Sequence, residues 1–409
     1  MRAPQYSDNL NELFDQVCIE NPFPMLERLR AQSPVSQIGD SGFHLVTSWK
    51  LINEVLKREY DFSSNLTGVL YKTREGLPAS FDFPDTGAIN VIATADGSDH
   101  ARQRKILLPG FTRIAISKYE QFIRQIVYTE VQNLLVSEQG DSIPIIEKIP
   151  AAVIGGILGL PTCDLQKFSR WSMIGGSMLA GEIQSEKLEY LASETEKMRS
   201  YLTAQFDGSV NSDICNDNAI INLLYKSVER GELSKQEAIG ILIILFGAGG
   251  ESTSALIGSA IFYISKFPEL QREIRANKNL IGIYVEEIAR LQPPFKFHYR
   301  SVIKDCSLGG CEIFAGEKLL LSWDSANRDD ELFEDPNTLS LHRKYPQRHM
   351  SFGRGIHFCL GTLLARLETR LVLEELIEST SNISILKNPT YLHSIFVRRL
   401  TSLNVAIDS

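Results

Sequence analysis

The stretch that decides the fold is Met350-Ser-Phe-Gly-Arg-Gly-Ile-His-Phe-Cys-Leu-Gly-Thr-Leu-Leu-Ala-Arg366, where a loop punctuated by glycines surrounds one cysteine and leads into an apolar helical pattern. The glycines allow tight turns and a close approach of the backbone to a bound group. We expect a helix to begin near Leu360 and to direct its N-terminal amides toward the sulfur of Cys359. This arrangement favours an ionised thiolate, the form in which cysteine binds a metal.

Two other interpretations of Cys359 remain open on this stretch alone. A cysteine without a partner is most often a buried, unreactive side chain. A zinc site built from His349, His357 and Cys359 is possible by composition, although the spacing of these residues matches no common zinc-binding pattern. Motifs elsewhere in the chain are needed to decide between these interpretations.

The composition narrows the class of protein. Of the 409 residues, 43% are hydrophobic and 22% are charged, so the chain can bury a large core. The formal net charge of −8 and the pI near 5.5 speak against a nucleic-acid-binding surface, which would show a basic excess. The N-terminus has no apolar signal core, and the longest apolar run, residues 238–250, is shorter than the ~20 residues that span a bilayer. We therefore expect a soluble, cytoplasmic protein with no membrane segment.

The cysteines show no spacing typical of a disulfide framework, which fits a reducing compartment. Two of them flank Gly309-Gly310, a pattern typical of a hairpin turn, and are interpreted as structural or incidental. The six cysteines are Cys18, Cys163, Cys215, Cys306, Cys311 and Cys359.

Helical patterns outweigh strand patterns along the chain. They dominate from about Asn9 to Gly231, and apolar residues recur every three or four positions between Tyr119 and Leu135. No repeat or low-complexity linker divides the chain, which predicts one mainly α domain over residues 1–409 with small β-sheets near both ends. Residues 63–92, rich in Gly, Pro and Asp, are expected to be an irregular loop over a site. Short strands are expected at residues 43–47, 311–313 and 318–323, and around Ile395 and Leu403.

A long central helix is the clearest single element. Ser234-Lys-Gln-Glu237 is a capping box, and apolar residues then cover nearly all faces until Lys266 and Pro268. A helix that is apolar all round is buried. Inside it, Gly247-Ala-Gly-Gly-Glu-Ser-Thr253 is an unfavourable composition for a helix interior and predicts a bulge that frees carbonyl groups. Taken alone, this segment also fits a small-residue patch for helix packing.

The spacing Phe352-Gly-x-Gly-x-His357-x-Cys359-x-Gly361 resembles the signature of the cytochrome P450 family. The resemblance extends from about His100 to the C-terminus and implies the P450 fold, a single mainly α domain with small β-sheets built around the long central helix. It also implies haem b (iron protoporphyrin IX) as cofactor, with Cys359 as the axial thiolate ligand of the iron. Phe352, His357 and Gly361 then belong to the cofactor-binding loop.

The resemblance gives Glu251 and Ser252 catalytic roles. Glu251 is expected to relay protons, and Ser252 is expected to hydrogen-bond dioxygen on the iron. Serine stands here where the family usually has threonine, with Thr253 next to it. A serine hydroxyl can still donate, so we expect oxygen activation to be retained, with less efficient coupling of electrons to product because its rotamer is less restricted.

Four cationic or donor side chains are assigned to the haem propionates by the same resemblance. His100 and Arg104 are four residues apart and project from one helix face. Arg300 and His357 complete the set. Because the propionates make haem a dianion, its burial requires charge-assisted partners of this kind. An isolated His-x-x-x-Arg would otherwise be a solvated helix face.

Glu287 and Arg290, three residues apart, would by spacing alone form an ordinary surface pair. The resemblance instead implies a buried network that includes Arg343 and supports the loop carrying Cys359. Removing one partner of such a network would leave a buried charge unpaired.

The implied reaction is insertion of one oxygen atom from O2 into a largely hydrophobic small molecule, with a bacterial secondary metabolite as the expected substrate class. Electrons are expected from a separate ferredoxin and ferredoxin reductase, or a flavodoxin, and we expect the protein to act as a monomer.

Lids over the substrate pocket are expected at residues 63–92 and 168–190. A basic patch for an acidic ferredoxin is expected at Arg102, Lys105, Arg113, Arg348 and Arg354. The expected substrate pocket comprises Ile244, Ala248, Phe295, Phe297, Ile395 and Phe396.

Two alternatives to this reaction are kept. Ser252 motivates a haem-thiolate enzyme with atypical chemistry, such as peroxide-driven oxidation or oxidative coupling. A haem-containing binding or sensing module without turnover would be expected to lack the acid and the alcohol of the central helix, and both are present.

Overall fold

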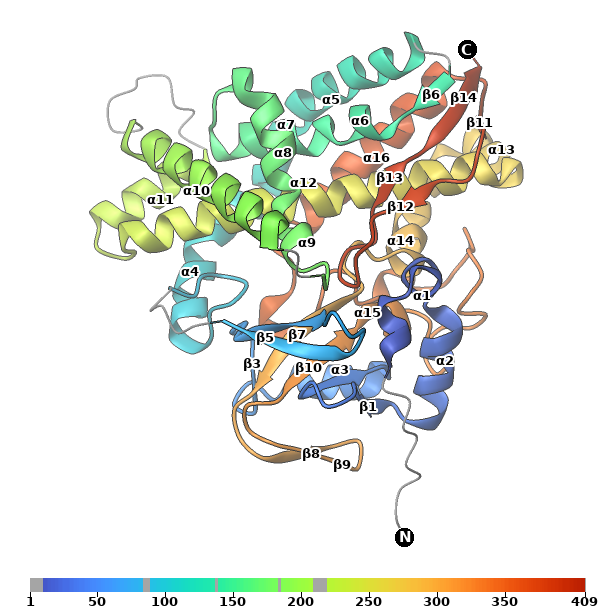
Figure 1. Ribbon diagram of the computed structural model, residues 1–409. Helices are drawn as coiled ribbons and strands as arrows, with labels where there is room; N and C mark the ends of the chain where they lie inside the picture. The colour runs from blue at the N-terminus through green and yellow to red at the C-terminus, as the bar shows by residue number, and fades with distance from the viewer. Residues whose placement is uncertain (1–9, 84–88, 137–138, 183–184, 209–218, 409) are drawn as a thin grey trace.

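The computed structural model describes residues 10–83, 89–136, 139–182, 185–208 and 219–408. The upper part of the molecule in Figure 1 is a stack of helices, and most of the strands lie in the lower part. The predicted mainly α architecture with small sheets is therefore confirmed. Cys215 lies outside the described residues.

The longest described helix, α12, runs through the helical part and packs against α7, α8 and α16 (Figure 1). The α-helices of the described residues are α1 (Gln16–Glu20), α2 (Phe23–Gln32), α3 (Trp49–Val55), α4 (Gly97–Leu107), α5 (Arg113–Val136), α6 (Ile143–Ile146), α7 (Lys148–Leu158), α8 (Leu165–Ser172), α9 (Ile174–Met178), α10 (Ser185–Gly208), α11 (Ile220–Glu229), α12 (Lys235–Lys266), α13 (Pro268–Ala276), α14 (Ile281–Leu291), α15 (Trp323–Ala326) and α16 (Thr362–Ser379).

The largest sheet has five strands in the order β1-β2-β10-β7-β3, with β10 parallel to β2 and antiparallel to β7. A three-stranded sheet and three hairpins complete the β structure of the described residues. The strands are β1 (Val35–Gln37), β2 (Phe43–Val46), β3 (Phe62–Ser63), β4 (Gly68–Lys72), β5 (Pro78–Asp82), β6 (Gln139–Asp141), β7 (Phe297–Val302), β8 (Cys306–Leu308), β9 (Cys311–Ile313), β10 (Lys318–Ser322), β11 (Asn382–Ile385), β12 (Thr390–Tyr391), β13 (Leu400–Ser402) and β14 (Asn404–Asp408).

The capping box at the start of α12 is confirmed. The Ser234 hydroxyl accepts from the Glu237 N–H at 3.1 Å, and the Glu237 carboxylate accepts from the Ser234 N–H at 2.8 Å. By length and hydropathy α12 could cross a membrane, and 61% of its most apolar window is buried inside the protein. Its apolar faces are therefore covered largely by neighbouring helices, as expected of a core helix.

The predicted bulge in the glycine-rich part of α12 is wrong. The helix is α-helical from Lys235 to Lys266 without a change of helix type. The glycines instead allow close helix packing, because a Cβ on Gly250 would lie 2.2 Å from the Ser172 Cβ of α8.

Two further expectations for the backbone are wrong. Residues 63–92 are not simply an irregular loop, because β4 and β5 form a hairpin with Val69 opposite Phe81 and Tyr71 opposite Ala79. Its glycine and proline residues mark the turn and strand ends, and residues 84–88 lie outside the described part. No strand forms around Ile395, since the Ile395 N–H donates to the Ala180 carbonyl and pairing is limited to one bridge between Phe295 and Val397.

The other sequence-based expectations for the elements hold. The amphipathic pattern from Tyr119 to Leu135 lies within α5. The strands expected at residues 43–47, 311–313 and 318–323 are β2, β9 and β10, and Leu403 lies between β13 and β14. The helix expected to begin near Leu360 is α16, which begins at Thr362.

Candidate active site

A chamber with a cavity volume of about 260 Å³ lies between α12, α4, the start of α16 and β7. Its apolar lining includes Ile92, Ile244, Ala248 and Phe295. Its polar lining is concentrated on the side of the ligand loop, residues 350–361, where it includes His100, Arg104, His298, Arg300, His357 and Cys359. The chamber therefore has an apolar part and a part rich in cationic and donor groups.

The loop that precedes α16 holds Cys359 at the chamber wall. The Cys359 N–H donates to the Phe352 carbonyl at 2.8 Å, and the Thr362 hydroxyl donates to the Cys359 carbonyl at 2.7 Å. Gly353 and Gly355 have φ angles of 65° and 71°, in the left-handed region that favours glycine. A Cβ on Gly361 would lie 4.0 Å from the cysteine sulfur. The glycine spacing of the sequence thus shapes the loop around one sulfur atom.

The expectation that this geometry by itself favours a thiolate is wrong. Burial raises the pKa of the Cys359 thiol, although hydrogen bonding from Thr362 and Gly361 and the charge of Arg104 act in the opposite direction. Metal binding to a cysteine requires the deprotonated sulfur and releases its proton. A metal cation at the sulfur would supply the stabilisation that the surrounding protein does not.

His100, Arg104, Arg300 and His357 meet in the chamber, although they come from three separate parts of the chain. The rings of His100 and His357 are 4.0 Å apart between centroids. The guanidinium of Arg104 donates to the Phe358 carbonyl at 2.7 Å, and that of Arg300 donates to the Tyr299 carbonyl at 2.7 Å. Among the described residues, no carboxylate forms an ion pair with any of these four side chains.

The electrostatics of this cluster fit a dianionic ligand. The Nε2 atoms of His100 and His357 are buried without a hydrogen-bond partner among the described residues. Burial, then His100 and Arg300, lowers the pKa of His357 to about 3, and burial lowers the pKa of Arg300 to about 10. Buried cations and donors without anionic partners are costly. The two propionates of haem would supply the missing negative charge.

Ser252 and Glu251 of α12 face different surroundings. Ser252 lines the chamber with Ala248 and Ile244, which lie one and two turns before it on the same helix face. Its hydroxyl donates to the Ala248 carbonyl at 2.6 Å. Glu251 does not line the chamber: its carboxylate accepts from the Gly176 N–H at 2.8 Å and lies 3.4 Å from the Arg399 Nε.

Glu251 belongs to a buried network with two further charged groups. Its side chain is 2% exposed, and burial raises its pKa to about 7 against the lowering effect of Arg399. Arg399 also pairs with Glu147 at 2.6 Å, and the Glu147 side chain is 23% exposed. A Cβ on Gly176 would lie 2.3 Å from the Glu251 carboxylate, so a side chain there would displace this carboxylate. Charged groups therefore connect Glu251 to the surface.

Three of the six predicted substrate-pocket residues line the chamber and three lie elsewhere. Ile244, Ala248 and Phe295 line it. Phe297 and Ile395 instead line a separate small cavity beside Lys296, and Phe396 stacks behind Phe295 with ring centroids 4.9 Å apart. Successive side chains of a strand point to opposite faces, so Phe297 and Tyr299 of β7 face the core while His298 and Arg300 face the chamber.

His298 is one of the chamber residues that the sequence interpretation missed. Burial, with a contribution from Arg300, lowers the pKa of His298 to about 3. The sequence analysis expected no strand at residues 297–302, although a strand there would have placed His298 and Arg300, two residues apart, on the same face. This alternation is the signal that could have identified it.

The predicted network of Glu287, Arg290 and Arg343 is confirmed by its contacts. Glu287 lies 2.7 Å from Arg290 and 2.9 Å from Arg343, and the Glu287 and Arg290 side chains are both 0% exposed. Burial alone would raise the pKa of Glu287, but the two arginines lower it. Arg290 also donates to the Asn327 carbonyl at 3.0 Å, and the Asn327 side chain binds Met350 and Ser351 of the ligand loop.

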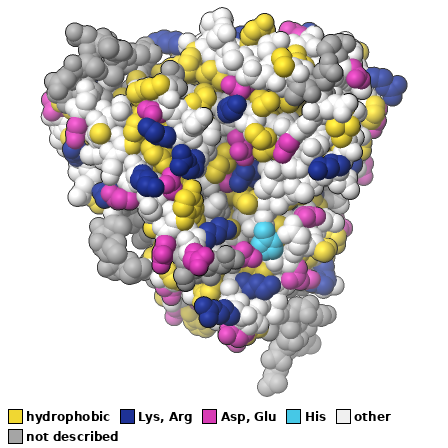
Figure 2. Space-filling view, turned by 45° about the horizontal axis from the view of Figure 1, so that its top comes forward, with side chains coloured by type: hydrophobic (Ala, Val, Ile, Leu, Met, Phe, Trp, Pro, Cys, Tyr) yellow, Lys and Arg dark blue, Asp and Glu magenta, His cyan; other side chains and the backbone are white. Residues whose placement is uncertain are grey.

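Several of the basic side chains predicted to bind a ferredoxin are engaged in contacts within the protein. Arg102 is engaged by Asp99 and Glu237, and Arg354 stacks over the Trp49 ring. Arg113 lines a groove with Arg366 and Arg370. On the face that Figure 2 shows, basic, acidic and apolar side chains are interspersed.

The two other interpretations of Cys359 find no support in the geometry. Within the part of the chain that the structure describes, no three His, Cys, Asp or Glu side chains are grouped so as to hold a metal ion. His349, one of the three residues of the possible zinc site, instead lies 3.3 Å from the carboxylate of Glu286. An inert buried cysteine would not require a chamber whose wall exposes its sulfur and gathers four donors.

Known proteins resemble this chain over nearly its whole length. The family model of cytochrome P450 matches residues 179–381. Cytochrome P450 144 of Mycobacterium tuberculosis is 36% identical over 404 residues, which are 97% of this chain and 92% of that protein. Beta-dihydromenaquinone-9 omega-hydroxylase of Mycobacterium bovis is 28% identical and covers 96% of this chain and 78% of its own length.

Solved structures agree with the sequence relatives. CYP109E1 from Bacillus megaterium in complex with testosterone has a TM-score of 0.84 and 28% identity, with 96% of this chain and 100% of that chain covered. Cytochrome P450 CREJ in complex with (4-ethylphenyl) dihydrogen phosphate has a TM-score of 0.86 and 25% identity, with coverages of 95% and 98%. Together with the chamber and its cysteine, these similarities show that the chain belongs to the cytochrome P450 family of haem monooxygenases.

Proposed function

We propose that the protein inserts one oxygen atom from O2 into a largely hydrophobic small organic molecule, with a bacterial secondary metabolite as the substrate class. The observation that carries this proposal is the chamber itself, where Ile244, Ala248 and Phe295 stand beside Ser252 and open onto Cys359. An apolar wall with few polar groups selects apolar ligands. The similar CYP109E1 was solved in complex with testosterone, and a similar mycobacterial protein is a beta-dihydromenaquinone-9 omega-hydroxylase, which supports an apolar substrate class.

We propose haem-binding roles for the residues around Cys359 and for the cluster of cationic and donor side chains. When bound, haem supplies the iron at which dioxygen is activated, and Cys359 supplies its thiolate ligand. His100, Arg104, Arg300 and His357 hold the propionates through charge-assisted hydrogen bonds. Phe352 and Gly361 shape the loop beside the sulfur and leave room for a flat cofactor.

Ser252 and Glu251 are the proposed proton-delivery pair. The Ser252 hydroxyl lines the chamber, and exchanging its bond to the Ala248 carbonyl for one to a ligand needs only rotation about χ1. Burial raises the pKa of Glu251 to about 7, so this carboxyl group can both take up and release a proton near neutral pH. Its carboxylate points to Gly176 and Arg399, so delivery to the chamber requires rotation of that side chain. Glu147 and Arg399 are positioned to connect it to solvent.

Electrons are proposed to come from a separate ferredoxin and its reductase, or a flavodoxin. Arg113, Arg366 and Arg370 line a groove between α5 and α16, which begins just beyond Cys359, but Arg366 pairs with Glu286, and Arg370 pairs with Glu120 and Glu374. Because basic side chains favour the approach of an acidic carrier, the end of this groove at Arg113 is the proposed docking face. We place the reaction in the cytoplasm, where such carriers are available.

A direct test compares ligand binding and turnover. Terpenes, macrolides, fatty acids and aromatic peptides would be screened with purified holoenzyme for shifts of the Soret band, and binders would be assayed with redox partners under O2. We expect apolar panel members to shift the band and to yield products containing one added oxygen. Binding restricted to strongly charged compounds would contradict the proposed substrate class.

Atypical chemistry is the second candidate, because Ser252 replaces the usual threonine and its hydroxyl is bound to the Ala248 carbonyl. The same binders would be incubated with hydrogen peroxide alone. Efficient peroxide-driven oxidation or coupling, together with O2 uptake that yields no oxygenated product in the presence of redox partners, would favour this alternative.

Glu251→Gln is expected to change how stability depends on pH. The folded protein favours the neutral acid, since the pKa rises from 4.5 to about 7. Wild-type stability should therefore fall as pH rises from about 4.5 to about 7, by about 3 kcal/mol, and remain constant above. The glutamine variant should lack this fall. Urea unfolding of both proteins across this pH range measures the difference, and parallel stability curves would contradict the assignment.

A further inference from the structure

The wall of the chamber contains one strained residue, Ile92. Its φ angle is 38°, in the left-handed region that a β-branched side chain rarely adopts. The Thr94 N–H donates to the Val91 carbonyl at 3.1 Å, so Ile92 lies at the second position of a tight turn. Ile92 is 7% exposed and lines the chamber. Strain at a ligand-facing position persists only where surrounding contacts enforce it.

Two contacts hold the turn in place. Val91 packs on Gly240 of α12, where a Cβ would lie 3.2 Å from the Val91 Cγ2. The Ile92 N–H donates to the side-chain oxygen of Gln103 in α4 at 2.6 Å. Gln103 is 0% exposed, so this amide has no competing water contact at the protein surface. The central helix and α4 together fix the position from which the Ile92 side chain meets the chamber.

The orientation of the Gln103 amide is itself fixed. Its nitrogen donates to the Glu237 carboxylate at 3.1 Å, which only accepts hydrogen bonds when ionised. The amide oxygen must therefore face Ile92. Hydrogen bonds from Arg102, Ser234 and Gln103 outweigh the effect of burial and lower the pKa of Glu237 to about 2, so it stays ionised at neutral pH.

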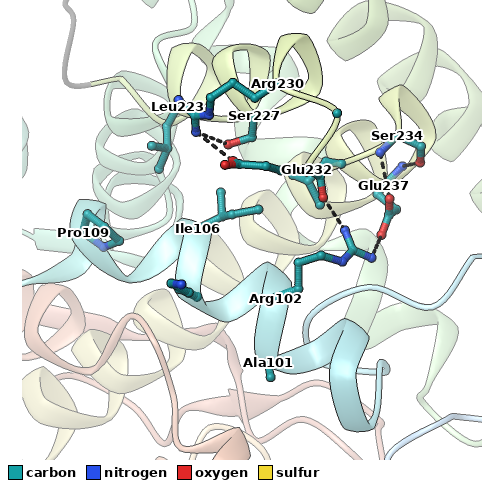
Figure 3. Close-up of a pocket in the computed structure, with 13 residues that line it drawn as sticks. Ala101, Arg102, Ile106, Pro109, Leu223, Ser227, Arg230, Glu232, Ser234 and Glu237 are labelled. Atoms are coloured by element: carbon teal, nitrogen blue, oxygen red, sulfur yellow. Dashed lines mark hydrogen bonds and ion pairs between the residues drawn. The ribbon is translucent and has the colours of Figure 1, made fainter.

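A surface groove is connected to the chamber through this carboxylate. Figure 3 shows Arg102 of α4 reaching Glu237 at the start of α12, where Ser234 binds the same carboxylate. Arg102 also donates to the Glu232 carbonyl at 2.6 Å. The contacts therefore run from the groove through Arg102, Glu237 and Gln103 to Ile92.

We propose that Gln103 is a positioning residue that sets the ligand specificity of the chamber through Ile92. Gln103 does not line the chamber, whereas Ile92 does. By holding Ile92 in its left-handed conformation, the amide fixes how far the isoleucine side chain reaches into the apolar part of the chamber. This inference rests on the proposed function, because it requires ligands to occupy that part.

The test uses two probes of different size on the holoenzyme, imidazole and 4-phenylimidazole, with dissociation constants taken from the Soret shift. The variants are Ile92→Ala, Gln103→Leu and their combination. We expect each single variant to weaken 4-phenylimidazole binding about tenfold, because the phenyl group loses an apolar partner, while imidazole binding changes by less than about twofold. In the Ile92→Ala background, Gln103→Leu should have no further effect on the ratio of the two constants.

Ile89→Ala is the matched control, because Ile89 belongs to the same segment and is 46% exposed outside the chamber. It should leave both constants unchanged. An unchanged ratio in Ile92→Ala, or an effect of Gln103→Leu that persists without the isoleucine side chain, would overturn the inference. If Gln103→Leu does not fold, the ratio in Ile92→Ala alone still decides whether Ile92 contacts ligands. Failure of the wild type to bind either probe would instead contradict the proposed function.

Discussion

Replacement of Cys359 by serine is expected to abolish monooxygenase activity and to remove the absorption band that thiolate-ligated haem shows when it is reduced and treated with carbon monoxide. Cys359 is the described cysteine whose sulfur lines the chamber. A serine hydroxyl fits the same loop but does not ionise near neutral pH, so it cannot replace the thiolate as a strong donor to iron. The folded loop should persist, because its backbone hydrogen bonds do not involve the sulfur.

Cys163→Ser provides the matched control. Cys163 is an exposed free cysteine outside the chamber, so its replacement should leave the absorption band and the turnover unchanged. Haem content would be measured beside the spectrum, which separates loss of the ligand from loss of the cofactor. A Cys359→Ser protein that retained the thiolate band would contradict the assignment of the iron ligand.

The parts of the site that the sequence predicted are those encoded in short segments. The ligand loop is one such part, because the glycine positions and Cys359 lie within a few residues of one another and the local backbone geometry follows from their order. The capping box of α12 is another, since Ser234 and Glu237 satisfy each other within one turn. The network around Glu287 was predicted only because its spacing resembles a known family.

The parts that could not be predicted depend on contacts between distant segments. The orientation of Glu251 depends on Gly176 of α9 and on Arg399 near the C-terminus, and nothing in the sequence around Glu251 specifies either contact. The separate location of Ile395 has the same origin, since its backbone bonds to Ala180. Phe297 is different, because predicting the strand at residues 297–302 would have been enough to place it on the face away from Arg300.

Arg290→Leu is expected to destabilise the protein by about 3–5 kcal/mol, because it leaves the buried Glu287 with one charged partner in place of two. The substitution also removes the donors to the carbonyls of Asn327, Pro336 and Thr338. Urea unfolding of the holoenzyme measures the loss. Arg290→Lys keeps the charge but cannot make all these hydrogen bonds, so an intermediate loss is expected.

Arg199→Leu is the control, because it removes an arginine from an ion pair that is exposed to solvent, whereas Arg290→Leu removes one from a buried pair. Arg199 and Glu196 form an arginine–glutamate pair three residues apart, like Arg290 and Glu287, but their side chains are 58% and 56% exposed. Stability should barely change there, because water replaces the lost partner. If Arg290→Leu were equally harmless, Glu287 would have to be neutral or solvated. Asn327 would then hold Met350 and Ser351 without help from the network.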